Sequence, residues 1–125
     1  MVEELLNYKN EDEIKIKRKP YTNTKMMDRE SLNQLIKKDS NYGKMVCKCE
    51  SVTVGEIIEA INSPLKPKSV DAIKRRVRAG MGRCQGGFCY MYVMELIAKL
   101  NNMKLEEVCK EEEGTNFIVG NIKGV

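Results

Sequence analysis

The chain has 125 residues, of which 42% are hydrophobic and 32% are charged, and its formal net charge is +4. This length gives room for one domain of ordinary size with appendages, and the apolar share excludes a disordered chain. Its N-terminus, MVEELLNYKNEDE, is too acidic and polar for a signal peptide, and no apolar run is long enough to span a membrane, so we expect a cytoplasmic protein.

The first predicted elements are a short strand and a helix. Apolar and basic side chains alternate at residues 14–17, which is typical of a half-buried strand. Asp28 is the predicted N-cap of a helix that runs to about Lys38. The apolar residues of this helix follow i, i+3, i+4 spacing and are Leu32, Leu35 and Ile36.

Two capped helices are predicted in the middle of the chain. Thr53 and Glu56 form a capping box at the start of a helix with one apolar face, made of Ile57, Ile58 and Ile61. A proline-bounded linker follows at residues 63–67. Ser69 is then the predicted N-cap of a helix that we expect to end with Gly80 at its C-terminal cap.

A glycine-rich loop and a longer helix come next. Residues 80–87 contain four glycines, which indicates a tight loop, and residues 88–101 carry the strongest helical pattern. The apolar face of that helix comprises Cys89, Val93, Leu96, Ile97 and Leu100. Residues 105–108 form a short amphipathic stretch, and residues 117–119 are a predicted strand that pairs with residues 14–17.

The five cysteines include two close pairs. Cys47 and Cys49 form a C-x-C motif, and after 34 intervening residues Cys84 and Cys89 form a C-x4-C motif. Each pair comes from a loop that leads into a predicted helix, so four thiolates can converge on one point. In a cytoplasmic chain, clustered cysteines indicate metal or redox chemistry rather than disulfides. Four thiolates suit either a 2Fe-2S cluster or zinc.

The spacing of the pairs favours the cluster over zinc. Structural zinc sites usually separate each pair by two to four residues, which the second motif satisfies and the first does not. The chain has no histidine, which excludes a Rieske-type centre. A four-thiolate 2Fe-2S cluster is negatively charged, and the predicted groups that stabilise it are Arg83, the two helix N-termini, and the backbone N–H groups around Gln85, Gly86 and Gly87. A zinc-stapled interaction domain remains the alternative.

The other functional signals are weaker. Cys109 is predicted to be a small buried hydrophobic residue. A basic run indicates either a solvated helix face or a docking surface for an acidic redox partner; it comprises Lys74, Arg75, Arg76 and Arg78. The chain lacks the aromatics or module typical of nucleic-acid binding. It also lacks an acid–base or nucleophile pair at catalytic spacing, so we expect no catalytic site in this chain alone.

Two stretches of the chain resemble a known family. Residues 45–53 (MVCKCESVT) and residues 75–89 (RRVRAGMGRCQGGFC) are similar to the bacterioferritin-associated-ferredoxin-like 2Fe-2S domain. In bacterioferritin-associated ferredoxin itself two residues separate the last cysteine pair. The gap of four between Cys84 and Cys89 resembles instead the version appended to FAD-dependent dehydrogenases. The ferredoxin namesake also suggests iron delivery to a ferritin-like shell as a third hypothesis.

Residues 18–20 and 35–43 are similar to the stretch that precedes this domain in anaerobic glycerol-3-phosphate dehydrogenases and related oxidoreductases. The resemblance implies an electron-transfer module that is the C-terminal part or the partner of such a flavoprotein. It also implies FAD in that parent or partner protein. The chain itself has no GxGxxG motif after a strand to hold the dinucleotide.

The predicted fold is therefore mainly α. We expect a small helical domain, with helix-turn-helix-like hairpins around a four-cysteine metal site and short strands near both termini. Residues 1–43 are predicted to be an N-terminal extension with one helix and a strand. Residues 44–109 form the predicted 2Fe-2S-binding domain, and residues 110–125 form a C-terminal tail with a strand.

Overall fold

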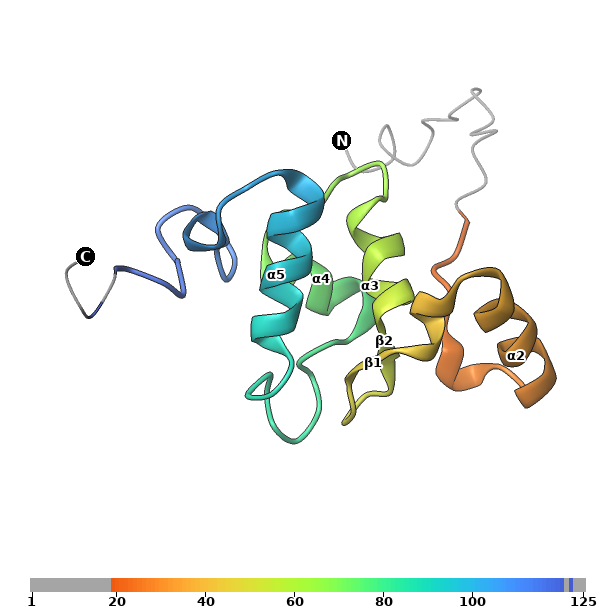
Figure 1. The fold of residues 1–125 in the computed structure, drawn as a ribbon. Coiled ribbons are helices and arrows are strands. Elements are labelled where there is room, and N and C mark those ends of the chain that lie inside the picture. The colour runs from red at the N-terminus through yellow and green to blue at the C-terminus, as the bar shows by residue number, and fades with distance from the viewer. Residues whose placement is uncertain (1–18, 121, 123–125) are drawn as a thin grey trace, which may run out of the picture.

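The computed structural model of the protein describes residues 19–120 and 122, and it is mainly α-helical, as predicted (Figure 1). Its α-helices are α2 (Arg29–Lys38), α3 (Val54–Ile61), α4 (Val70–Val77) and α5 (Tyr90–Asn101). Short 3-10 helices cover Thr24–Met26, Ser40–Gly43 and Leu105–Glu107. One antiparallel hairpin pairs β1 (Met45–Cys47) with β2 (Val52–Thr53). None of the described helices is long and apolar enough to cross a membrane.

The hydrophobic core lies between α3, α4 and α5, which contact one another in pairs, whereas α2 stands to one side (Figure 1). The large side chains that are fully buried are Ile57, Ile61, Val70, Ile73, Val93, Ile97 and Val108. Burying each such branched side chain stabilises the fold by about 1.5–3 kcal/mol relative to leaving it exposed. On α5, Met94 is also buried, while Leu100, predicted on the inner face, is 37% exposed. The segment that contains Cys47 and Cys49 and the segment that contains Cys84 and Cys89 therefore pack on the same hydrophobic core.

The three predicted N-caps are confirmed. Asp28 Oδ2 accepts a hydrogen bond from the Ser31 N–H at 3.0 Å, and Ser69 caps α4 in the same way. Thr53 and Glu56 form the predicted capping box at the start of α3. Each cap stabilises its helix by about 1 kcal/mol, because it satisfies a backbone donor that has no partner within the helix.

The predicted C-terminal cap of α4 at Gly80 is wrong. Arg78 occupies the cap in the left-handed conformation, with φ 66°, and its N–H donates to the Lys74 carbonyl at 2.8 Å. A non-glycine residue adopts this conformation at a cost of about 1–2 kcal/mol. The Arg78 side chain offsets part of that cost, because its Nε lies 3.0 Å from Glu50 Oε2. Gly80 also has a positive φ of 89°, but it lies two residues further on.

The strand predicted at residues 117–119 does not form. Instead, Cys109 makes isolated bridges with Ser69 and with Asn116, so the C-terminal segment crosses the start of α4. Its predicted partner, residues 14–17, lies outside the described residues. Three apolar residues are too few to specify a strand without a neighbour at the correct register.

The segment before β1 is bonded to α3 through a buried carboxylate. Glu56 is only 4% exposed, and its oxygens accept from both the N–H (2.9 Å) and the hydroxyl (3.1 Å) of Thr24. Glu59 accepts from the Thr22 N–H at 3.1 Å. Residues 22–24 are therefore held against the helix that supports the first cysteine pair.

Candidate metal centre

The β hairpin positions the first cysteine pair. Cys47 is the last residue of β1, pairs with Val52, and is 1% exposed. Cys49 lies in the turn between the strands and is exposed. The chain reverses at Ser51, which has a φ of 57°. The sequence predicted a plain loop here, because strands of three and two residues are too short to show alternation.

The glycine-rich loop positions the second pair. Cys84 is half-buried, and Cys89 is the 1% exposed N-cap residue of α5. Gly82 allows the loop to lie against the hairpin, since a Cβ atom added at Gly82 would be 2.1 Å from the Cβ of Cys49. Gly86 has a φ of 85°, which turns the chain between the two cysteines.

Tyr90 packs against the loop at two points. A Cβ atom added at either Gly80 or Gly86 would lie 2.3 Å from its ring, so both glycines leave space that the tyrosine fills. Phe117 of the C-terminal segment packs edge-to-face on Tyr90, with ring centroids 5.8 Å apart and an interplanar angle of 69°. Sequence reasoning missed this contact, because nothing local links an aromatic residue in α5 to glycines upstream and a phenylalanine downstream.

All four predicted cysteines line one cavity of about 220 Å³, together with Val46, Lys48 and Phe88. The Sγ atoms of Cys49 and Cys84 are 3.6 Å apart. Cys47 and Cys89 form the inner side and belong to the hydrophobic core. The site is therefore organised as an outer pair near solvent and an inner pair against the core.

Within the described part of the chain, no three Cys, His, Asp or Glu side chains converge closely enough to enclose a single metal ion. A tetrahedral zinc, at about 2.3 Å from each sulfur, requires every pair of sulfurs to be about 3.8 Å apart. The outer pair meets this distance, but no third ligand joins it. The four cysteines around one cavity are nevertheless a donor set of the kind that holds a 2Fe-2S cluster.

Cys89 and Cys84 differ in acidity. Burial, together with the adjacent Cys47 and Cys84 thiols, raises the pKa of Cys89 to about 12. The pKa of Cys84 is lowered, mainly by a hydrogen bond with Cys49 and then by the backbone N–H groups of Phe88 and Gly86. Metals bind thiolates, so a metal has to displace a firmly held proton from Cys89.

The backbone donors differ in part from those predicted. The N–H of Gln85 donates to the Gly82 carbonyl, and the N–H of Gly87 donates to the Cys84 carbonyl, both at 3.0 Å. These bonds close consecutive tight turns, which is why the two groups have an oxygen partner already. The backbone N–H groups of Gly86 and Gly87 still contribute to the lowered pKa of Cys84, and Phe88, which the sequence did not indicate, adds a third.

The predicted positive groups are only partly available. Arg83, beside Cys84, is exposed and makes no hydrogen bond or ion pair with another described residue. The N-terminus of α5 begins at Cys89 without a side-chain cap, so its dipole favours a negative charge at the site. The N-terminus of α3 is less available to the site, because its Val54 N–H already donates a hydrogen bond to the Lys44 carbonyl at 2.8 Å.

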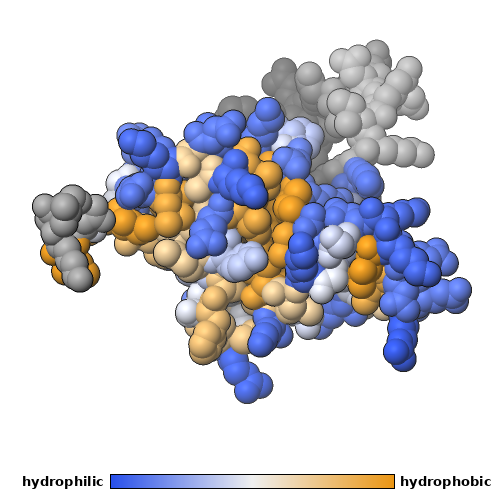
Figure 2. Space-filling model, in the orientation of Figure 1, coloured by the Kyte–Doolittle hydropathy of each residue, from blue (hydrophilic) through white to orange (hydrophobic). Residues whose placement is uncertain are grey.

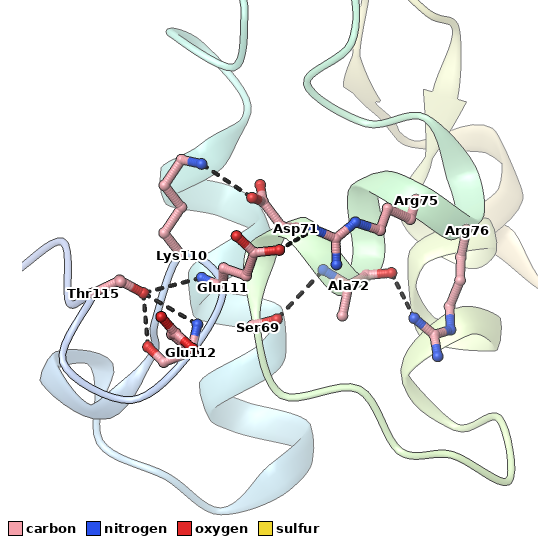
Figure 3. A network of polar contacts seen from close by, with 9 residues as sticks. All are labelled: Ser69, Asp71, Ala72, Arg75, Arg76, Lys110, Glu111, Glu112 and Thr115. Atoms are coloured by element: carbon pink, nitrogen blue, oxygen red, sulfur yellow. Dashed lines mark hydrogen bonds and ion pairs between the residues drawn. The ribbon is translucent and has the colours of Figure 1, made fainter.

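The basic run on α4 is only partly free. Arg75 pairs with Glu111, and Arg76 donates to the Ala72 carbonyl at 2.7 Å (Figure 3). Arg78 pairs with Glu50, whereas Lys74 forms no ion pair with another described residue. Figure 3 also shows Lys110 of the C-terminal segment reaching Asp71 on the same helix, with Nζ and Oδ2 3.0 Å apart. Such surface pairs contribute about 0–1 kcal/mol each, and they neutralise Arg75 and Arg78, whereas Arg76 keeps its charge because its partner is a backbone carbonyl.

Cys109 is half-buried rather than buried as predicted. Its thiol donates to the Glu107 carbonyl at 3.5 Å, and its backbone forms the bridges to Ser69 and Asn116. The neighbouring Val108 takes the core position, with 0% exposure. Cys109 does not line the cavity of the four other cysteines.

Comparison with known proteins agrees with this geometry. The segment from β1 to α5, residues 45–99, matches the family model of the BFD-like [2Fe-2S] binding domain. Residues 45–99 belong to this family. The match includes both cysteine pairs, which agrees with the resemblance found in the sequence. No solved structure matches the chain.

Several larger proteins contain a region similar to this chain. Glycerol 3-phosphate dehydrogenase from Caloramator mitchellensis is 50% identical over 91 residues, which is 73% of this chain and 19% of the relative. An opine oxidase subunit from Rhizobium meliloti is 44% identical over 59 residues, which is 47% of this chain and 11% of the relative. An anaerobic glycerol-3-phosphate dehydrogenase subunit from Escherichia coli is 40% identical over 60 residues, which is 48% of this chain and 11% of the relative. The chain thus spans a fifth or less of each relative's length.

Proposed function

We propose that the chain is the electron-transfer module of a FAD-dependent dehydrogenase such as glycerol-3-phosphate dehydrogenase. In this proposal Cys47, Cys49, Cys84 and Cys89 ligate one 2Fe-2S cluster. The observation that carries it is the cavity that all four cysteines line as an outer and an inner pair. The names of the relatives, two dehydrogenases and an oxidase, support the same class of reaction.

A bound 2Fe-2S cluster supplies a one-electron couple, and its four cysteinates give it a net negative charge in both oxidation states. The residues of the chain hold that charge in three ways. Gly86 and Phe88 donate backbone N–H groups to Cys84, α5 directs its N-terminus at Cys89, and Arg83 adds a positive charge near Cys84. These groups favour the more negative, reduced form and so raise the reduction potential.

The dehydrogenase chemistry itself belongs to another part of a larger protein or to a partner. In our proposal FAD is bound there, and residues 44–109 relay its electrons one at a time. The segments 1–43 and 110–125 flank this module in the sequence, and the contacts of Thr24 and Lys110 support the attachment of residues 19–43 and 110–120 to it. We place the module in the cytoplasm, where thiols are kept reduced until the cluster is inserted.

The first experiment is the metal content of protein purified without oxygen. We expect two iron and two acid-labile sulfide ions per chain, and a visible spectrum that dithionite bleaches. Cys84→Ser should lower the cluster content strongly. Cys109→Ser is the matched control, because this half-buried cysteine lies outside the cavity, and it should leave the cluster content unchanged. One zinc ion per chain with no sulfide, in an iron-replete preparation, would instead establish a structural zinc domain.

A further inference from the structure

We propose that the surface around Phe88 is the docking face for the flavoprotein that exchanges electrons with this centre. The face consists of Phe88 and Val46 at the mouth of the cavity, with Lys48 and Arg83 at its edge. The partner surface that fits it has an apolar patch next to its flavin and carboxylates around that patch. This inference rests on the proposed function and names the kind of surface that the module binds.

The burial of the cysteines decides from which side a partner approaches. Cys47 and Cys89 are each 1% exposed and face the core, whereas Cys49 is exposed and Cys84 is half-buried. A redox partner therefore comes closest to the site on the side of the outer pair. Phe88 lies on that side, because it belongs to the same loop as Cys84 and lines the cavity beside it.

Phe88 is the apolar anchor of the face. Its side chain is 90% exposed although it lines the cavity next to the half-buried Val46. Single exposed apolar residues are ordinary on protein surfaces, as Leu65 illustrates with 78% exposure on a distant turn. Phe88 differs because it lies one residue before Cys89 and lines the cavity of the four cysteines, so its ring lies beside the site. Aromatic side chains in such positions commonly anchor interfaces.

The edge of the face is positively charged. Lys48 stands between the two hairpin cysteines and Arg83 precedes Cys84, and both side chains are exposed. Neither forms an ion pair with any residue of the described ranges, in contrast to Arg75 and Arg78 on α4. The nearby acidic residue, Glu50, is already paired with Arg78. The face therefore keeps its positive charge and selects a partner with carboxylates.

The figures place these features together. The hairpin and the cysteine loop both reach the lower edge of the molecule in Figure 1. In Figure 2 the same edge combines apolar with strongly hydrophilic side chains. An apolar centre with a charged edge is typical of transient interfaces. Most of the similar dehydrogenase lies outside the match, which covers 19% of its length, and in the proposed function the flavin belongs to such a region or to a partner.

The test measures electron transfer from reduced flavodoxin, a small acidic flavoprotein, to the cluster-loaded full chain in anaerobic stopped-flow experiments. Phe88→Ser and Lys48→Gln should each lower the second-order rate per intact cluster by about fivefold or more. The matched controls are Leu65→Ser and Lys99→Gln, which remove an exposed apolar side chain and an exposed cation elsewhere. These controls should change the rate by less than about twofold. Added salt should slow the wild type more than Lys48→Gln.

Reduction by dithionite, measured in parallel, separates the two proposals. If a cluster forms and dithionite bleaches it in every variant, but flavodoxin reduces all variants equally or reduces none, the docking face is refuted and the proposed function stands. A face variant that slows dithionite as much as flavodoxin also refutes docking, because the change then lies in the cluster. If no redox-active cluster forms, the proposed function itself fails, and the docking inference falls with it.

Discussion

Replacing Glu56 by glutamine should destabilise the protein strongly, although the two side chains have nearly the same size and shape. One carboxylate oxygen of Glu56 accepts from the Thr24 N–H, and the other accepts from the Thr53 N–H at 2.7 Å. Glu56→Gln preserves the shape of the side chain but converts one oxygen into an NH₂ group. Whichever way the amide turns, one buried backbone N–H then faces a donor instead of an acceptor.

The expected loss follows from this geometry. A buried donor without a partner costs about 1–3 kcal/mol, and the remaining bonds lose the contribution of the negative charge. Together we expect the free energy of unfolding to fall by about 2–4 kcal/mol, a large part of the roughly 5–15 kcal/mol that is typical of a domain. With an m-value of about 2 kcal/mol/M, the urea midpoint should fall by about 1–2 M.

The assay is urea unfolding of the reduced, metal-free protein, followed by helical circular dichroism. Glu59→Gln is the matched control: Glu59 is half-buried on the same helix and accepts from Thr22 and Tyr42 at 3.1 and 3.4 Å. Because water can reach this position, the control should lose no more than about 1 kcal/mol. Equal midpoints for the two variants would refute the reasoning, since the argument depends on burial.

Three further changes test the cysteine segments. Gly82→Ala places a Cβ atom 2.1 Å from that of Cys49 and should lower the iron content severalfold, whereas Gly120→Ala meets nothing within 4 Å and should leave it unchanged. Phe117→Ala removes the ring that packs on the α5 tyrosine, so an iron chelator should bleach the cluster faster while the helical circular dichroism stays the same. Arg78→Ala keeps the left-handed strain without the ion pair and should lower stability by about 1 kcal/mol in urea unfolding, whereas Arg78→Gly relieves the strain and should change it less.

The parts of the fold that could be predicted are those that local chemistry specifies. The N-caps at Asp28, Thr53 and Ser69 were predicted correctly, because each side chain bonds to a backbone group within its own helix turn. Cys47 and Cys84 were singled out by residue type and spacing, although 36 residues separate them in the chain and only the fold brings them to one cavity.

The parts that were missed depend on contacts between distant segments. The cap at Arg78 requires Glu50, the buried Glu56 carboxylate requires Thr24, and the position of Tyr90 requires glycines ten and four residues earlier. None of these pairings has a periodic or positional signature in the sequence. The same holds for the basic run, whose charges were counted correctly but whose partners lie on other segments.

The two cysteine pairs are held by different forces, and this bears on how a cluster is inserted. The inner pair, Cys47 and Cys89, is fixed by the hydrophobic core, whereas the outer pair depends on the close approach of Gly82 to Cys49. Burial keeps the Cys89 proton in place, with a pKa of about 12, while Cys84 ionises more readily. On the proposed function, a metal that binds here would have to replace the firmly held proton of Cys89. A preformed inner pair lowers the conformational cost of metal binding, because its side chains are already ordered by the core.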